Sequence, residues 1–491
     1  MTEGTIDLLV IGGGINGAGI ARDAAGRGLS VLLVEKDDLA SATSSASSKL
    51  IHGGLRYLEQ YEFRLVAEAL AEREVLLATA RHLVWPARFV MPHVPGLRPR
   101  WMIRAGLFLY DHLTRRASLP GSVAARLDCP PLNSGLKPEL AHGFEYSDCR
   151  VDDARLVVAN AMSARELGAA IAPRTECVSA RRENGLWHAV LSDGRDLRAQ
   201  AIVNASGPWV KRTLNERLAQ PSPEAVRLVK GSHVVLPKLY EGDHAFILQN
   251  DDRRVVFMIP YEGRFTLVGT TDVAVEEAVQ SRATQEEVEY LCRAVNRYLA
   301  RPVRPEQALW RYAGVRPLYD DGSSDPSAIT RDYTLKVDDE AGRAPVLSVF
   351  GGKITTYRRL AEHAMQRLLP YFAGCKGEWT ARAPLAGSNF GAGGRQGAQT
   401  ALAARYPNIP GAILRALFRR HGAKTADVLG DAQSVAGLGE DFGGSLSERE
   451  IAYFVEQEWA RTAEDVLWRR TKAGLQMNEQ QRARVVQRMG R

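Results

Sequence analysis

A glycine pattern near the N-terminus constrains the fold of this chain more strongly than any other feature. An apolar run at 6–10 leads into GGGING at 12–17, an Ala-rich segment follows at 20–28, and a second apolar run at 31–34 ends at Glu35. This order predicts a strand, a tight turn, a helix and a second strand with an acid at its end. In such a unit the pyrophosphate of a dinucleotide lies at the helix N-terminus. The spacing G-x-G-x-x-G also occurs in structural loops, so the flanking pattern carries the prediction.

The glycines and the acid of this pattern have separate roles. Gly12 permits the tight turn, Gly14 lets the backbone approach a pyrophosphate, and Gly17 lets the helix pack against the strand. Glu35 is placed to accept a hydrogen bond from a ribose hydroxyl and would repel a 2′-phosphate. The pattern therefore predicts a dinucleotide that carries no 2′-phosphate.

Composition places the chain among ordinary globular proteins. It has 491 residues, of which 45% are hydrophobic and 25% charged, enough for two or three lobes with a large core. The start lacks the basic and long apolar segments of a signal peptide, and no uncharged apolar run approaches the ~18–20 residues that span a bilayer. The five cysteines are scattered without a C-x-x-C pair, which favours reduced thiols in the cytoplasm and no metal site.

The net charge of +7 indicates an affinity for anions. A phosphorylated substrate, an anionic membrane surface and nucleic acid are the three classes of partner that a basic protein can have. The sequence carries no DNA- or RNA-binding signature beyond scattered arginines, so we expect no nucleic-acid partner. The oligomeric state is open, with a homodimer as one option.

The order of predicted elements indicates an α/β fold with a doubly wound cofactor domain built from discontinuous pieces. We expect this domain at about 1–82, 151–225 and 333–385, a mixed-sheet substrate domain at about 83–150 and 226–332, and a C-terminal helical cap domain at 398–491. Pro, Gly and Ser enrichment at 384–397 predicts a linker. We interpret the many charges of the last domain as a solvated face.

A hydroxyl- and glycine-rich segment at 41–57 follows the first unit. It is either a flexible linker or the lining of a long cofactor that stays bound. The second interpretation is favoured because an amphipathic helix follows, with Phe63, Val66, Leu70 and Leu77 on one face.

Three long stretches, at 11–28, 44–58 and 351–361, resemble FAD-dependent glycerol-3-phosphate dehydrogenases, most closely the aerobic, membrane-associated bacterial form. Shorter matches at 144–149, 151–156, 230–233, 312–318 and 329–333 extend the resemblance over nearly the whole chain. It implies non-covalent FAD in a Rossmann-like fold of the glutathione-reductase and D-amino-acid-oxidase type. It also implies oxidation of sn-glycerol 3-phosphate to dihydroxyacetone phosphate, with electrons passing to ubiquinone or menaquinone.

The resemblance also implies a set of FAD-binding residues. Gly207 lies in a predicted strand break that, in such flavoproteins, returns the chain to the cofactor, although Gly-Pro also ends ordinary strands. The full set is Gly12, Gly14, Ile15, Asn16, Gly17, Glu35, Lys36, Ser44, Ser45, Ser48, His52, Gly53, Gly54, Val178, Gly207, Trp209, Gly314, Gly352, Lys353, Ile354 and Thr355.

Lysine and arginine residues inside the matching motifs are implied to handle the flavin and the phosphate. Lys353, beside a predicted helix start, would stabilise the anionic reduced flavin, or it is a surface lysine. Arg316 and Arg331 resemble the phosphate-binding pair and Arg56 a third contact. Arginine suits this role because its planar donors stay charged, although most arginines are surface charges.

The oxidation of a secondary alcohol requires a group that takes the hydroxyl proton. His233 is the candidate base because imidazole titrates near neutral pH, and the alternative is a hydrogen-bonded core histidine. Tyr57 and Lys353 are alternatives for orienting or polarising the hydroxyl.

A short apolar segment at 101–113 is flanked by several arginines. It is either an interfacial element on the cytoplasmic face of the membrane or a buried core helix, and periodicity does not separate the two. The flanking residues are Arg98, Arg100, Arg104, Arg115 and Arg116. An interfacial role would make the protein a peripheral membrane protein.

Four rival functions remain. A glycerol-3-phosphate oxidase would keep the site but reduce dioxygen. An amine- or amino-acid-oxidising flavoprotein is disfavoured by the three arginines of the phosphate set. The anaerobic multi-subunit dehydrogenase would carry a C-terminal cysteine cluster, yet no cysteine follows Cys375. A flavin-binding sensor without turnover is the non-enzymatic alternative.

Overall fold

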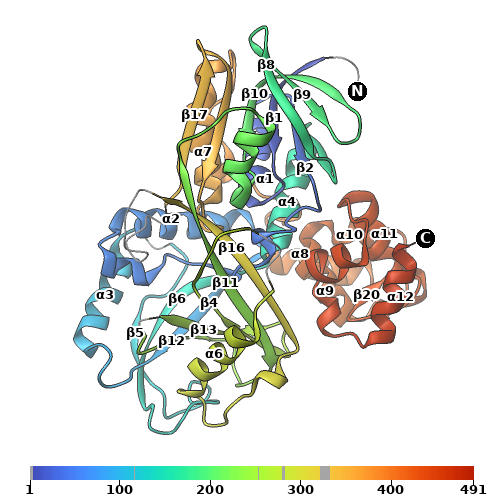
Figure 1. The fold of residues 1–491 in the computed structure, drawn as a ribbon. Helices are drawn as coiled ribbons and strands as arrows, with labels where there is room; N and C mark the ends of the chain where they lie inside the picture. Colours follow the sequence, from blue (N-terminus) through green and yellow to red (C-terminus); the bar gives the residue numbers. More distant parts are fainter. Residues whose placement is uncertain (1–3, 116, 253, 279–281, 321–331, 491) are drawn as a thin grey trace.

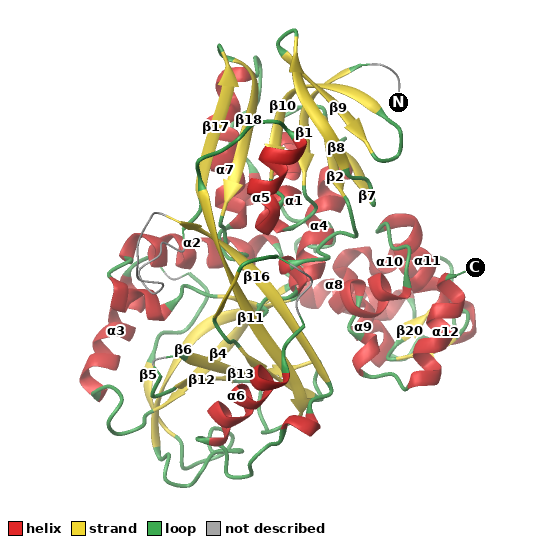
Figure 2. Ribbon diagram, in the orientation of Figure 1, coloured by secondary structure: helices red, strands yellow, loops and turns green. Residues whose placement is uncertain are grey.

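Two large sheets and a C-terminal group of helices make up the computed structural model (Figure 1). The structure describes residues 4–115, 117–252, 254–278, 282–320 and 332–490. Figure 2 shows the first sheet flanked by helices, the second sheet beneath it, and the C-terminal helices beside both.

The first sheet has a parallel centre. β1 (Thr5–Ile11) lies between β2 (Val31–Glu35) and β10 (Asp196–Asn204), and the sheet order is β17-β18-β10-β1-β2-β7. The remaining strands are β7 (Ala170–Pro173), β8 (Cys177–Glu183), β9 (Leu186–Leu191), β17 (Thr334–Glu340) and β18 (Arg343–Phe350). β1 and β2 are apolar almost throughout because both faces of this sheet are covered.

Helix α1 (Ile15–Gly26) packs against α4 (Asp153–Glu166) and α7 (Tyr357–Leu368). The small residues of α1, among them Ala18, Ala21 and Ala24, are completely buried in this contact. α1 begins earlier than the predicted 20–28 segment because the last motif residues themselves form its first turn. The prediction of a doubly wound fold with strand, turn, helix and strand is confirmed.

The second sheet is mixed, and β11 (Ala225–Pro237) lies near one edge of it, paired with both β14 and β16 (Trp310–Asp320). Its other strands are β3 (Leu50–Ile51), β4 (Val84–Pro92), β5 (Val123–Arg126), β6 (His142–Val151), β12 (Ala245–Gln249), β13 (Val255–Tyr261), β14 (Phe265–Gly269) and β15 (Val273–Val275). Helices α2 (Phe63–Thr79), α3 (Arg100–His112), α5 (Val210–Arg212) and α6 (Gln285–Asn296) complete these lobes. On α2 the buried face carries Val66 and Leu70, whereas Phe63 is exposed, so the predicted face is partly wrong.

The C-terminal domain consists mostly of short helices. They are α8 (Gly394–Arg405), α9 (Gly411–His421), α10 (Thr425–Leu429), α11 (Glu448–Gln457) and α12 (Glu479–Met489), with the small hairpin β19 (Asp441–Gly443) and β20 (Leu446–Ser447). Our interpretation of its charges as a solvated face is wrong for several of them. Arg155 of α4 donates to Glu458 (Nη2 to Oε1, 2.9 Å), and Glu458 and Arg470 are completely buried.

The segment at 384–397, which composition predicted to be a linker, is packed against the rest of the chain over its first half. Leu385, Ser388 and Phe390 are buried. The Leu385 amide donates to the Thr79 carbonyl (2.9 Å), and Ser388 bonds to His82 (2.8 Å). The segment is therefore fixed to the rest of the chain, because small residues here allow close packing rather than freedom.

Candidate active site

One large cavity, with a volume of about 580 Å³, lies where the two sheets meet. Its lining comes from the turn after β1, the 41–57 segment, the turn after β10, strands β11 and β16, and the loop before α7. This volume is in the range of cofactor and ligand pockets. The 41–57 segment therefore lines a cavity, as we predicted, and is not a solvent-exposed linker.

The glycine turn at one end of the cavity is fixed by backbone packing. Gly12 has φ +114°, and a Cβ there would lie 2.5 Å from the Ala205 carbonyl oxygen. A Cβ on Gly17 would lie 1.9 Å from the Gly12 carbonyl oxygen. Only glycine satisfies both positions, and the turn brings the N-terminus of α1 to the cavity.

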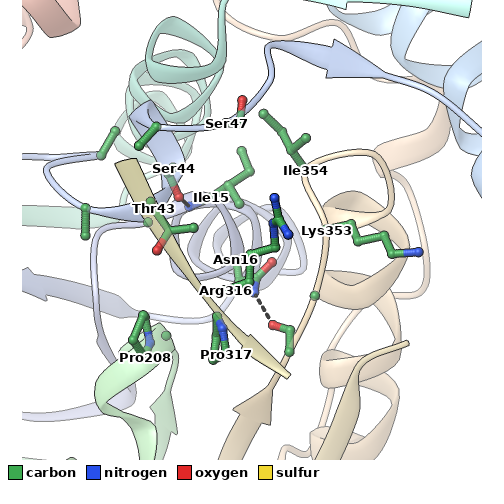
Figure 3. A pocket seen from close by; sticks show the side chains of 18 of the residues that line it. Ile15, Asn16, Thr43, Ser44, Ser47, Pro208, Arg316, Pro317, Lys353 and Ile354 are labelled. Atoms are coloured by element: carbon green, nitrogen blue, oxygen red, sulfur yellow. Dashed lines mark hydrogen bonds between the residues drawn. The ribbon is translucent and has the colours of Figure 1, made fainter. Parts of the chain in front are cut away.

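Side chains from three segments complete this end. The Ser44 hydroxyl accepts a hydrogen bond from the Ile15 amide (3.0 Å), and the Asn16 side chain donates to the Gly351 carbonyl (3.2 Å; Figure 3). Glu35 accepts from the Gly13 amide (2.7 Å). Burial raises the pKa of Glu35, while the amides of Asp37 and Gly13 partly offset this. Each carboxylate oxygen of Glu35 can accept further hydrogen bonds, as a ribose would require.

The 41–57 segment is held by buried polar contacts. Ser47 and Lys49 both bond to Asp153 of α4 (2.7 and 2.8 Å), and Thr43 donates to the Val315 carbonyl (2.6 Å). Further along, the Gly53 amide meets the hydroxyl of Tyr110 (2.8 Å). The hydroxyl groups of this segment therefore form hydrogen bonds with fixed groups elsewhere in the chain, and these bonds hold the cavity wall in one shape.

The other end of the cavity carries a cation and a buried histidine. Arg316 of β16 donates to Asp272 and to the Thr270 hydroxyl (3.3 Å). His233 of β11 bonds through Nε2 to Ser48 (2.9 Å) and stacks on Tyr312 with ring centroids 5.0 Å apart. Burial, then Arg316 and Lys49, hold the pKa of His233 well below its usual value. The imidazole is therefore neutral and can accept a proton.

The side chain of Lys353 lies beside Tyr57 and not beside the turn at Gly12–Gly17. Its Nζ lies 4.1 Å from the centroid of the Tyr57 ring. Figure 3 shows Lys353 extending away from Asn16. The helix that follows begins at Tyr357, two residues later than the predicted 355, so Lys353 belongs to a turn ahead of the helix. His52 also lines the cavity, and burial lowers its pKa.

Most of the predicted site residues line this cavity. They are Gly12, Gly14, Ile15, Asn16, Glu35, Lys36, Ser44, Ser48, His52, Gly54, Arg56, Tyr57, Gly207, Trp209, His233, Gly314, Arg316, Gly352, Lys353, Ile354 and Thr355. Arg331 lies outside the described residues.

Four predicted residues do not line the cavity. Gly17 packs against the Gly12 backbone, Ser45 bonds back to the Ala42 carbonyl (3.3 Å), and Gly53 meets Tyr110 behind the wall. Val178 of β8 is 38% exposed and is not part of the lining, so its contact with the cofactor stays a prediction. Its neighbours Glu176 and Cys177 line the cavity instead.

Sequence reasoning missed several wall residues. Thr270 and Asp272 follow the apolar strand β14, and a polar pair after an apolar strand was the available signal. Phe257 and Ile247 carry no such signal because apolar strand residues usually belong to the core. Among the described residues, no group of His, Cys, Asp and Glu side chains could hold a metal ion, and all five cysteines are free.

Two family models match the chain. The model described as FAD dependent oxidoreductase covers residues 7–358, and the C-terminal domain of alpha-glycerophosphate oxidase covers 379–490. The aerobic glycerol-3-phosphate dehydrogenase of Escherichia coli (strain K12) is 53% identical over 98% of this chain and 97% of its own length. The chain belongs to the FAD-dependent glycerol-3-phosphate dehydrogenase family. It is an oxidoreductase that uses FAD.

Two further relatives sharpen this assignment. The D-erythritol 1-phosphate dehydrogenase of Brucella abortus (strain 2308) is 52% identical over 98% of this chain and 97% of its own length. The structure of the glycerol-3-phosphate dehydrogenase from Bacillus halodurans complexed with FAD superposes with a TM-score of 0.74 at 26% identity, over 100% of this chain and 95% of that one. The predicted family, fold class and cofactor are confirmed.

The residues present in the cavity fit FAD. A glycine turn without side chains leaves room for a pyrophosphate, and Glu35 stands at the ribose position. Within the described chain, the buried Oδ1 of Asn16 has no hydrogen-bond partner. Asn16 lines the cavity, so this oxygen is an acceptor that a ligand with donors would satisfy.

Proposed function

We propose that this enzyme oxidises sn-glycerol 3-phosphate to dihydroxyacetone phosphate. The observation that supports this most is Arg316, a guanidinium held at the cavity wall beside a neutral histidine. A Cβ on Gly231 would lie 2.4 Å from Arg316 Nη2, so the backbone of β11 is kept bare next to this cation. An arginine in a fixed orientation suits a phosphate group.

Arg316 and Arg331 bind the substrate phosphate in this proposal, with Arg56 as a third contact. Asp272 and Thr270 hold the Arg316 guanidinium so that its orientation costs little entropy on binding. FAD, when bound, supplies the acceptor for the hydride of the alcohol carbon.

His233 takes the hydroxyl proton in this proposal, while Tyr57 and Lys353 orient the oxygen. Ser48 fixes the imidazole and Tyr312 supports its face. A bound phosphate dianion would raise the low pKa of His233 toward the working pH, where a general base is most effective.

A second candidate substrate is D-erythritol 1-phosphate. It is favoured by the Brucella abortus relative, whose identity to this chain is close to that of the Escherichia coli enzyme. The two substrates share the phosphate and the secondary alcohol. Anaerobic bleaching of the bound flavin by each compound in turn, compared through kcat/KM, decides between them. A flavin that neither compound bleaches would contradict both assignments and favour the sensor.

We propose that the electrons then pass to ubiquinone or menaquinone. Reoxidation of the substrate-reduced protein by a soluble quinone analogue tests this, with air-saturated buffer as the parallel arm. We expect the quinone to be much faster. Faster reoxidation by dioxygen would make the protein an oxidase, the alternative suggested by the description of its C-terminal domain.

The surface of α3 supports peripheral binding to an anionic membrane at the cytoplasmic face. Trp101, Met102 and Phe108 are 71%, 45% and 54% exposed, so α3 is not a buried core helix. Arg100 and Arg115 are exposed beside them. Apolar residues flanked by cations suit an interfacial helix.

The arginines around α3 do not all support this role equally. Arg98 bonds to Glu59 (2.7 Å) and Arg104 to Ser122 (2.9 Å), so both have partners within the protein. Arg116 lies outside the described residues. Among the helices of the described chain, none is both long and apolar enough to cross a bilayer. A homodimer remains a proposal.

A further inference from the structure

A second cavity, with a volume of about 230 Å³, lies between the C-terminal domain and the second sheet. Its walls come from the ends of β6 and β13, the start of α4, helix α9 and the turn after Arg470. Lys49 belongs to the segment that forms the active-site wall, and Arg150 of β6 pairs with Leu50 of that segment. The lining includes Lys49, Arg150, Asp152, Tyr261, Arg419 and Lys472.

Two buried donors in this cavity lack hydrogen-bond partners among the described residues. Lys472 is 5% exposed and Tyr261 is 7% exposed, and neither Nζ nor the hydroxyl makes a hydrogen bond. The Lys472 Nζ has only an ionic contact with Asp152 Oδ1 at 3.5 Å. Leaving such groups unpaired costs free energy, so their presence in a cavity indicates a missing acceptor.

The cationic donors of the cavity favour an anion as that acceptor. Lys49 is paired with Asp153 (2.8 Å), and Arg419 is paired with Glu262 (2.7 Å). Those pairs leave two further cations in the wall.

The two remaining cations face a single interior carboxylate. Arg150 uses one donor on the Pro260 carbonyl (3.0 Å), and Lys472 has its ionic contact with Asp152. The other acid of the lining, Asp243, is exposed. Burial alone would raise the pKa of Asp152, but Lys472, Arg419 and Lys49 together lower it below its usual value. Asp243 acts electrostatically on Arg150 from its exposed position, so the interior has a surplus of hydrogen-bond donors over acceptors rather than of net charge.

We propose that this cavity binds a phosphate-class anion, coordinated by Lys472 Nζ, the Tyr261 hydroxyl and the Arg150 guanidinium. The volume admits inorganic phosphate or a small phosphate monoester. Because Lys472 belongs to the C-terminal domain and the other two to the second sheet, the anion ties these parts together. This inference does not depend on which substrate the active site oxidises.

Thermal unfolding of the FAD-loaded protein in millimolar inorganic phosphate tests the proposal, against chloride at equal ionic strength. We expect phosphate to raise the midpoint for the wild type and for Arg316→Ala, whose active-site cation is gone. We expect Lys472→Gln to lose the rise and to bind phosphate at least tenfold more weakly by calorimetry, with basal turnover unchanged.

Lys424→Gln is the matched control. Lys424 also lies in the C-terminal domain and contacts Glu166 of α4 (2.7 Å), but it is not part of the cavity lining. It should keep the phosphate response, which separates binding from the general stabilising effect of phosphate on folded proteins. A response that Lys424→Gln and Lys472→Gln share equally would overturn the proposal.

Two further measurements keep the test decisive. If Lys472→Gln does not fold, Tyr261→Phe removes only a hydroxyl and should weaken phosphate binding several-fold. Phosphate binding unchanged in that variant, or absent from the Arg316→Ala protein, means that the cavity holds only water. Tighter binding of methyl phosphate than of inorganic phosphate would identify an ester as the natural ligand, and the reverse would identify free phosphate.

Discussion

The two ends of the large cavity are built by different physical means. At the glycine turn the shape is set by backbone atoms, since a single methyl group on Gly12 or Gly17 would overlap a carbonyl oxygen. At the other end it is set by side chains, with Arg316 and His233 oriented by the groups they bond to. Substitutions should therefore act on cofactor retention at the first end and on turnover at the second.

The most complete effect is expected for Gly12→Ala, because an enzyme that loses FAD loses all turnover. Its Cβ would lie 2.5 Å from the Ala205 oxygen, and the residue has φ +114°. We expect FAD affinity to fall at least about 100-fold, or about 2.7 kcal/mol. Flavin absorbance per protein measures this. Gly28→Ala is the control, because φ is +96° but no atom lies within 4 Å of the new Cβ. It should cost about 1 kcal/mol of stability and keep FAD.

His233→Asn tests the second end of the cavity. We expect kcat to fall by about 10²–10⁴ with flavin content intact. His244 is another buried histidine, just before β12, and it does not line the cavity, so His244→Asn should retain turnover. Wild-type turnover in the mutant would make His233 a core histidine.

The pH dependence of the wild type follows from the same residue. Because the pKa of His233 is lowered, the neutral form persists below the usual titration range. The profile of kcat/KM should therefore show no loss of activity between about pH 8 and 6.5 from this group, and a fall only at lower pH. An inflection at about pH 6.5 that disappears in Ser48→Ala would contradict the environment described for the imidazole.

Arg316→Ala should have a somewhat smaller effect. Loss of a charge-assisted contact to the substrate phosphate predicts about 2–4 kcal/mol of lost transition-state binding. Arg311→Ala, an exposed arginine of the same strand, is the control. Normal kinetics in the Arg316 variant, with both proteins yellow, would show that its pairing with Asp272 is only structural.

The smallest effect on turnover is expected for substitutions in α3, because no residue of this helix lines the cavity. We expect Trp101→Glu to weaken sedimentation with anionic liposomes about tenfold, with turnover of the soluble assay unchanged. Added salt should weaken wild-type binding further, at about 1 kcal/mol per contacting arginine. Val486→Glu changes an apolar residue that is also exposed, but in the C-terminal domain, and should bind liposomes normally. A wild type that stays in the supernatant at low salt would contradict the membrane proposal.

The backbone-built end was predictable from the sequence because its requirements are local. A turn that has no room for Cβ atoms requires glycine at fixed spacing, and the apolar runs on either side of it predict the flanking strands. The side-chain end was predictable only in part. Arg316 and His233 were found through their motifs. Thr270 and Asp272 carried only the weak signal of polar residues after an apolar strand, and they meet Arg316 because β11 pairs with both β14 and β16.

The C-terminal part was the least predictable. The sequence predicted solvated charges here because it does not reveal distant ion pairs. Glu458, for example, pairs with Arg155, about 300 residues away in the chain. The segment at 384–397 has the composition of a linker, yet small residues serve equally well where a chain must pack closely. The periodicity of α3 did not distinguish a core helix from a surface one until its exposed side was known.

β11 and β16 pair from Ala225↔Asp320 to Val235↔Trp310, and in Figure 1 they run as a long ribbon between the two lobes. We expect this pair of strands to be rigid, because bending it sharply would break several inter-strand hydrogen bonds at once. His233 lies on β11 and Arg316 on β16, so the distance between their side chains should change little while substrate enters and product leaves. We therefore expect substrate and product to pass by small local movements near the cavity mouth rather than by an opening of the two lobes.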